Sequence, residues 1–232
     1  MNKTYFNWST GKDSALALYK LLKDETYVVE KLVTTINTHS NRVSMHGLRI
    51  ELLKAQTAAI GILVQYIELP EQPTMYDYNA IMTTATNQLK AEDYTHAAFG
   101  DIFLEDLKFY REMQLLEVGI NGVFPLWKRN TKKLINEFLD LGFKAIVVCA
   151  DAKYFNEDFV GTILDHDTIN NLPETVDPCG ENGEFHTFCF DGPLFKAPIP
   201  FTIGEKMYRE YPLPNDKSKR AGFWYCDLIH ED

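Results

Sequence analysis

Six consecutive residues near the N-terminus have the composition of a phosphate-binding loop. They are Ser9, Thr10, Gly11, Lys12, Asp13 and Ser14. At the N-terminus of a helix, backbone N–H groups point outward without partners, and the helix dipole favours an anion. Gly11 allows the backbone to come close to such a ligand. The segment therefore predicts a site for the phosphate groups of a nucleotide.

The residues on either side of this loop have the patterns of a strand and a helix. An apolar run at residues 3–8 precedes the loop, and apolar residues at helical spacing follow it over residues 13–23. Nucleotide-binding α/β folds hold phosphate at this position, between the first strand and the first helix. An ordinary helix start after a strand is the alternative interpretation.

Two common phosphate-binding motifs do not match the loop. A Walker A motif needs a glycine five residues before its Gly-Lys pair and a serine or threonine after the pair. Phe6 and Asp13 occupy those two positions. A dinucleotide-binding fingerprint needs three glycines, whereas residues 9–14 contain one. The loop therefore belongs to another class.

A second candidate segment begins at Gly100 and Asp101, directly after a short expected strand. Asp101, Glu105 and Asp106 offer carboxylates to Mg²⁺ or to a cationic group of a substrate. Acidic residues in the first turn also stabilise a helix through its dipole. Both interpretations stay open for this segment.

A third segment is dense in glycine, carboxylate and polar side chains. It comprises Asp177, Pro178, Cys179, Gly180, Glu181, Asn182, Gly183, Glu184, Phe185, His186 and Thr187. Its weak periodicity suggests either a binding loop that leads into a strand or a structural turn. A zinc site is a poor interpretation, because Cys179, His186 and Cys189 lack the paired spacing of zinc ligands.

Strand and helix patterns alternate along the chain up to about residue 150. Strands are expected at residues 28–37, 63–69, 97–99, 121–124 and 144–149, and helices at 47–60, 75–90, 105–118 and 131–141. Such alternation forms βαβ crossovers and a mostly parallel sheet. We predict an α/β fold with a Rossmann-like sheet in the order 3-2-1-4-5 and helices on both faces. The first and fourth strands would then be neighbours, so the loop and Asp101 would face one crevice.

The pattern changes after about residue 152, where proline, glycine and aromatic residues become dense. We predict a smaller, irregular α+β C-terminal region with a few short strands. The expected division of the chain is 1–150 for a nucleotide-binding domain and 151–232 for a substrate-binding region. The aromatic segment at residues 223–225 is expected either in the core or on the surface of a homodimer.

The composition restricts the partners and the compartment. With 232 residues, of which 45% are hydrophobic, the chain can form one main domain with a smaller appendage. A net charge of −10 makes nucleic acid an unexpected partner. No signal peptide or membrane-spanning run is expected. Four widely spaced cysteines indicate reduced thiols and a cytoplasmic protein.

Four motifs in order resemble the diphthine–ammonia ligase family of pyrophosphate-loop ATP pyrophosphatases, in particular its less characterised branch. The motifs are Ser-Thr-Gly-Lys-Asp-Ser at residues 9–14, Gly-Asp-Ile at 100–102, Phe-Pro-Leu-Trp at 124–127 and Gly-Glu-Asn-Gly-Glu-Phe-His-Thr at 180–187. The family's loop usually reads Ser-Gly-Gly-x-Asp-Ser. Thr10 therefore replaces a glycine, and we expect its φ to be negative because a Cβ disfavours positive φ. Asn182 replaces a glycine of the Glu-Gly-Gly-Glu motif found in members that make diphthamide.

The resemblance implies an adenine nucleotide α-hydrolase-like domain and ATP-driven amide formation. A carboxylate would attack the α-phosphate, which releases pyrophosphate and leaves an acyl adenylate, and ammonia would then displace AMP. ATP and Mg²⁺ are the implied cofactors. The acceptor carboxylate would be diphthine on elongation factor 2 only in an organism that has this modified residue.

The resemblance also implies roles for individual residues. ATP would be bound by Ser9, Thr10, Gly11, Lys12, Asp13, Ser14 and Gly100. Catalysis would depend on Lys12, Asp13, Asp101 and Glu184, and Mg²⁺ would be held by Asp13 and Asp101. The acceptor would contact His46, Arg49, Glu105, Glu181, Asn182, Glu184 and His186. For His46 and Arg49, an exposed helix start is the alternative.

Two other functions remain alternatives at this stage. Pyrophosphate-loop proteins also transfer sulfur to tRNA, which requires paired reactive cysteines and a basic surface. A nucleotide-binding sensor without turnover is the other alternative. The acidic segments after the loop favour catalysis over sensing.

Overall fold

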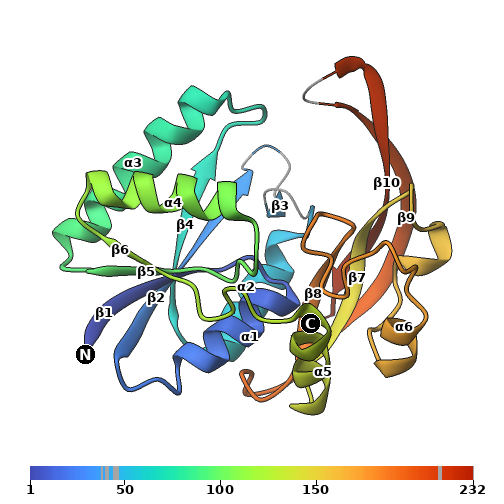
Figure 1. The fold of residues 1–232 in the computed structure, drawn as a ribbon, viewed down its shortest axis with the longest axis horizontal. Helices are drawn as coiled ribbons and strands as arrows, with labels where there is room; N and C mark the ends of the chain where they lie inside the picture. The colour runs from blue at the N-terminus through green and yellow to red at the C-terminus, as the bar shows by residue number, and fades with distance from the viewer. Residues whose placement is uncertain (38, 40–41, 44–46, 214–215, 232) are drawn as a thin grey trace.

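The computed structural model describes residues 1–37, 39, 42–43, 47–213 and 216–231. Its N-terminal part contains a largely parallel sheet (Figure 1). The strands are β1 (Asn2–Asn7), β2 (Tyr27–Asn37), β3 (Arg42–Val43), β4 (Leu63–Leu69), β5 (His96–Ala98) and β6 (Asn121–Val123). The parallel strands lie in the order β4-β2-β1-β5-β6, and β3 pairs antiparallel with β2. This is the predicted 3-2-1-4-5 order, which is therefore confirmed.

Helices cover both faces of this sheet. They are α1 (Lys12–Leu21), α2 (Ile50–Ile60), α3 (Met75–Ala91), α4 (Glu105–Glu117) and α5 (Thr131–Asp140). Successive residues of a strand point to opposite faces, so Phe6 packs in the core with α1 and α2, whereas Tyr5 packs in a second core with α3 and α4. Figure 1 shows α3 and α4 on the upper side of the sheet and α1 below it.

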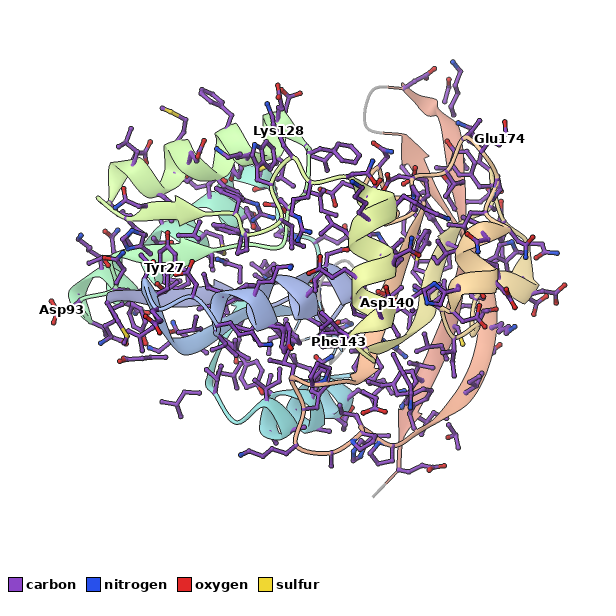
Figure 2. The ribbon with its side chains drawn as sticks, turned by 60° about the horizontal axis from the view of Figure 1, so that its bottom comes forward. Tyr27, Asp93, Lys128, Asp140, Phe143 and Glu174 are labelled. Atoms are coloured by element: carbon purple, nitrogen blue, oxygen red, sulfur yellow. The ribbon has the colours of Figure 1, made fainter. Side chains whose placement is uncertain are left out.

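Aromatic packing joins the helix α1 to the helix α5. The ring of Phe143, which follows α5, lies 5.5 Å from the ring of Tyr19 in an edge-on contact. It also stacks on Phe138 at 5.0 Å. Figure 2 labels Phe143 near the end of α5. Because these rings are buried or half-buried, they fix the helix that follows the phosphate loop against the C-terminal half of the chain.

The C-terminal part forms a separate antiparallel sheet in the order β8-β7-β10-β9. Its strands are β7 (Lys144–Asp151), β8 (Phe185–Asp191), β9 (Phe201–Leu213) and β10 (Asp216–His230), and the connections include the short helices η1 (Glu157–Phe159) and α6 (His166–Asn170). The division of the chain at residue 150 stays a proposal. The strand β7 begins before that point but pairs with β8 and β10.

The expectation of only short strands in this region is wrong. The strands β9 and β10 have 13 and 15 residues and pair along most of their length. The density of prolines suggested interruption, yet Pro212 lies in β9, an edge strand, which tolerates proline better than a central strand does. Within the described residues, no helix has both the length and the apolar character needed to cross a membrane.

Candidate active site

A cavity of about 590 Å³ lies at the carboxyl ends of β1, β2 and β5. Its volume is in the range of small-molecule sites, about 300–1,000 Å³. The predicted site residues that line it are Ser9, Gly11, Lys12, Asp13, Ser14, Gly100, Asp101, Glu181, Asn182 and His186. The structure thus brings together three segments that are distant in sequence, at the crevice where α/β sheets bind ligands.

The cavity extends from the phosphate loop to a less polar part beside α3 and α4. Tyr78 and Met82 of α3 line this part, together with Leu107 and Tyr110 of α4. The hydroxyl of Tyr110 donates to Asn79 Oδ1 at 2.5 Å and so joins the two helices. This arrangement provides a polar end for phosphates and an apolar end for an organic group.

The phosphate loop connects directly to β8. Gly11 is the N-cap of α1, and the Oγ of Ser14 donates to the Gly11 carbonyl at 3.0 Å. The Lys12 N–H donates to Thr187 Oγ1 at 3.1 Å. A Cβ on Gly11 would lie 3.2 Å from the Thr187 carbonyl oxygen, so the close approach of the two segments favours glycine at this position.

The backbone of Thr10 differs from the expectation. Its φ is 71°, in the left-handed region, which a residue with a Cβ adopts only at a cost. The prediction of a negative φ is wrong. This conformation turns the side chain into the protein, where it is buried, and Thr10 does not line the cavity. Its hydroxyl is therefore not placed to donate to a phosphate there.

Lys12 and Asp13 form an ion pair at the start of α1, with Lys12 Nζ at 2.7 Å from Asp13 Oδ2. The ammonium also donates to the Cys179 carbonyl. Burial by itself lowers the pKa of Lys12, but the acidic groups around it, above all the Asp13 carboxylate, together outweigh burial and the pKa is raised. Burial raises the pKa of Asp13, and Lys12 opposes this shift. Lys12 thus stays charged and places a positive charge under the loop.

Gly100 and Asp101 form the opposite wall of the cavity. A Cβ on Gly100 would lie 3.0 Å from the backbone nitrogen of Ser14, so glycine allows this loop to pack on the start of α1. Asp101 Oδ2 lies 2.7 Å from Arg111 Nε on α4. Burial raises the pKa of Asp101, and Arg111 partly offsets the rise.

Sequence reasoning missed Arg111, although its spacing contained a signal. Leu107, Arg111 and Leu115 follow one another at intervals of four residues and all line the cavity. Residues at this spacing share one face of a helix. A charged residue on the face that is otherwise apolar indicates a partner in the interior, here Asp101.

Glu181 connects the third segment to the second. Its Oε1 accepts the N–H groups of Ile102 and Phe103 at 2.7 and 3.3 Å. Burial raises its pKa to about 7, and these two hydrogen bonds counteract part of the rise. Glu181 also lines the cavity. Its pKa lets its carboxyl group exchange a proton there near neutral pH.

Glu184 has a different position from the one predicted. It is buried, and its oxygens accept the N–H of Asp177 at 3.0 Å and the N–H of Asn182 at 2.9 Å. The Asn182 amide also donates to it at 3.0 Å. Glu184 does not line the cavity. Its position does not support direct contact with an acceptor, because the carboxylate is engaged within its own loop, whose shape it fixes.

Two other predicted acceptor contacts, Glu105 and Arg49, do not meet at the cavity. Glu105, the first residue of α4, is exposed and pairs at 2.9 Å with Lys128, which Figure 2 labels at the surface. Arg49 pairs with Asp227 of β10 at 2.6 Å. Neither lines the cavity, because each side chain turns to a partner elsewhere. His46 lies outside the described residues.

The side chains around the loop offer limited protein ligands for Mg²⁺. Among the described residues, no group of three or more His, Cys, Asp or Glu side chains could hold a metal ion. Mg²⁺ is often bound by one or two carboxylates together with substrate phosphates and water. Asp13 fits this arrangement because it lines the cavity beside the loop. Asp101 fits it less well because both its oxygens face Arg111.

Family models match most of the chain. The diphthamide synthase N-terminal domain matches residues 2–121 and the diphthamide synthase C-terminal domain matches residues 130–213. The diphthine–ammonia ligase of Schizosaccharomyces pombe is 32% identical over 92 residues, which cover 38% of this chain and 15% of that protein. The diphthine–ammonia ligase of Bos taurus is 35% identical over 79 residues, covering 32% and 30%. The matches thus span less than a third of either relative.

Two solved structures have a remote similarity. A predicted subunit of tRNA methyltransferase from Methanocaldococcus jannaschii has a TM-score of 0.41 and 17% identity, covering 64% of this chain and 79% of that chain. The U34-tRNA thiolase NcsA from Methanococcus maripaludis has a TM-score of 0.40 and 16% identity, covering 61% and 57%. These similarities are too remote to indicate a substrate.

Proposed function

The chain belongs to the diphthamide synthase family, and from this premise we propose that it is an ATP-dependent ligase that joins ammonia to a carboxylate. Two of its relatives are named diphthine–ammonia ligase. The observation that carries the proposal is the single cavity lined by the phosphate loop, by Gly100 and Asp101, and by residues of the third segment.

In the first step, the N–H groups of the phosphate loop and the Ser9 hydroxyl bind the β- and γ-phosphates of ATP, as anions are bound at a helix N-terminus. An oxygen of the acceptor carboxylate then forms a bond to the α-phosphorus, and the bond from that phosphorus to the leaving pyrophosphate breaks. The buried charge of Lys12 favours the negative charge that accumulates on the leaving group. Mg²⁺ held by Asp13 and phosphate oxygens would neutralise further charge there.

In the second step, ammonia attacks the acyl carbon of the adenylate, and AMP leaves with the carboxylate oxygen that attacked. The nitrogen must lose a proton during this step. Glu181 is the candidate base, because it lines the cavity and its pKa of about 7 lets it accept a proton near neutral pH. Asp101 is the second candidate for contact with the amine.

Diphthine is the proposed acceptor in an organism whose elongation factor 2 carries it, and another carboxylate takes its place elsewhere. Sulfur transfer to tRNA is less well supported. That chemistry needs reactive thiolates, whereas the four cysteines are buried and burial raises the pKa of each thiol. They are Cys149, Cys179, Cys189 and Cys226.

The experiment that tests the proposal follows the fate of ATP labelled at the α-phosphate. The protein is incubated with this ATP, Mg²⁺, ammonium and a panel of carboxylates that includes diphthine-modified elongation factor 2. The proposal predicts labelled AMP and an equal amount of pyrophosphate, dependent on one carboxylate. Labelled ADP as the product would contradict it. Tight ATP binding without turnover for any acceptor would favour a sensor instead.

A further inference from the structure

Gln56 of α2 is buried and joins three segments of the chain through one side-chain amide. Its Oε1 accepts the indole N–H of Trp8 at 2.8 Å. Its Nε2 donates to the carbonyl oxygens of Thr10 at 2.9 Å and of Cys189 at 2.6 Å. A side-chain amide has two N–H donors, so both are used. These partners fix the orientation of the amide, because its oxygen faces a donor and its nitrogen faces two acceptors.

One of these contacts is made to the strained residue of the phosphate loop. Thr10 has a φ of 71°, and a residue with a Cβ keeps this conformation only where its surroundings hold it. Its carbonyl accepts a second hydrogen bond, from the N–H of Cys189 at 3.0 Å. The Thr10 hydroxyl is buried without a hydrogen-bond partner among the described residues. The hydrogen bonds to the Thr10 carbonyl therefore hold this backbone in place.

The carbonyl of Thr10 and the N–H of Gly11 belong to the same peptide unit. In a planar trans peptide these two groups point in opposite directions. A hydrogen bond that holds the carbonyl toward the protein interior therefore directs the Gly11 N–H to the other side. Gly11 lines the cavity, and this N–H is the first of those that α1 offers to an anion.

We propose that Gln56 is a positioning residue that sets the phosphate affinity of the loop by holding the Thr10 carbonyl and so aiming the Gly11 N–H. The inference rests on the proposed use of ATP. It assigns a functional role to a residue that has no access to the substrate, and it explains how threonine is maintained at a position that glycine would occupy without strain.

The test compares Gln56→Glu with Gln88→Glu, the same substitution at an exposed glutamine of α3. Glutamate has nearly the same shape, but it donates to neither carbonyl oxygen when ionised and to at most one of them when protonated. Binding of α,β-methylene-ATP and of adenosine is measured by calorimetry. We expect Gln56→Glu to weaken binding of the ATP analogue by about tenfold or more and to change the binding of adenosine little. Gln88→Glu should change the binding of neither ligand. Unchanged binding of the analogue, or an equal loss for both ligands, would overturn the proposal.

A rescue experiment separates positioning from a general loss of structure. Glycine adopts a positive φ without strain, so the loop should depend less on Gln56 when Thr10 is replaced. We expect the double variant Thr10→Gly, Gln56→Glu to recover most of the lost affinity for the analogue, and failure to recover it would contradict the proposal. If Gln56→Glu does not fold, Trp8→Phe removes the indole donor together with part of a ring that lines the cavity, and it should cause a smaller loss that is still larger for the analogue than for adenosine.

The outcomes distinguish this inference from the function on which it rests. If the wild-type protein binds α,β-methylene-ATP no more tightly than adenosine, the proposed function itself fails. If the wild type prefers the ATP analogue and Gln56→Glu or Trp8→Phe keeps that preference in full, only the role of Gln56 fails.

Discussion

Glu181 illustrates how two opposing effects set the chemistry of a single residue. Burial favours the protonated carboxyl group, whereas the N–H groups of Ile102 and Phe103 favour the ionised form. The resulting pKa of about 7 lies between that of a surface glutamate and that of a carboxyl group without hydrogen bonds in the interior. The carboxyl group can therefore accept or release a proton near neutral pH.

This pKa predicts the pH dependence of the second step. The base must be ionised, so the rate with saturating ammonia should rise with pH and level off above about pH 7. Glu181→Gln should lower the rate by about 10²-fold or more and remove this part of the profile. The measurement is kcat for amide formation between about pH 5.5 and about pH 9, a range that brackets this pKa. Glu105→Gln, which removes an exposed carboxylate, is the control, and an equal effect of both substitutions would contradict the assignment.

The position of single side chains is the part of the site that the sequence could predict least. The types and spacing of residues 9–14 and 180–187 indicated a site, and most of these residues line one cavity. Arg49 and Glu184 turn instead to Asp227 and to the loop around Asp177. The sequence does not reveal such partners, because they depend on which segments the fold brings together.

At the scale of elements, α4 is attached to the loop after β5 by the ion pair of Asp101 and Arg111. The two side chains are 14% and 27% exposed, respectively, so water screens them incompletely. The guanidinium also lies over the ring of Phe99, with its carbon 4.4 Å from the ring centre. This contact holds one wall of the cavity to the helix that lines its apolar end.

Removing one partner of this pair should destabilise the protein more than removing the pair. Arg111→Leu leaves Asp101 partly buried without its cation and should lower the free energy of unfolding by about 2 kcal/mol or more. Adding Asp101→Asn should recover part of the loss. Urea unfolding measures both values. Lys128→Leu, which breaks the exposed pair with Glu105, should cost about 1 kcal/mol or less. If Lys128→Leu lowered the free energy of unfolding as much as Arg111→Leu does, burial of the pair of Asp101 and Arg111 would not explain the loss of stability.

The regular elements were predictable to different degrees. The strand order of the parallel sheet followed from the alternation of strands and helices, because each crossover is local in sequence. The antiparallel sheet was not predictable in the same way. Its strand β7 pairs with β8 and β10, which lie far along the chain, and β10 mixes charged and aromatic residues that do not mark one buried face.

At the scale of the whole molecule, Asp227 of β10 joins the two sheets. Its carboxylate accepts hydrogen bonds from Arg42 of β3 and from Arg49 before α2. Burial alone would raise the pKa of Asp227, but the two guanidinium groups outweigh burial and lower it below 3.8. The C-terminal hairpin is thus connected to the sheet that carries the phosphate loop.

The lowered pKa of Asp227 fixes the sign of a stability effect. A carboxyl group whose pKa is lower in the folded than in the unfolded state stabilises the fold at pH values above its pKa in the unfolded state. This contribution is lost as the pH falls through its pKa in the folded state. Asp227→Asn should therefore lower the free energy of unfolding by about 1.5–3 kcal/mol at pH 7. The difference from the wild type should shrink below about pH 4.

Urea unfolding of Asp227→Asn and the wild type at both pH values measures this difference. Asp140→Asn, at an exposed position of α5 (Figure 2), should change little at either pH. An undiminished difference between Asp227→Asn and the wild type in acid would show that the ion pairs are not the source of the stability.

The proposed function requires that a carboxylate oxygen attack the α-phosphorus of ATP. The most direct measurement uses the acceptor that supports AMP release, with both carboxylate oxygens replaced by ¹⁸O, and mass spectrometry of the nucleotide product after amide formation. We expect each AMP to carry one ¹⁸O on its phosphate, because the attacking oxygen stays on phosphorus when ammonia displaces AMP. Unlabelled AMP, or ADP together with labelled inorganic phosphate, would contradict it.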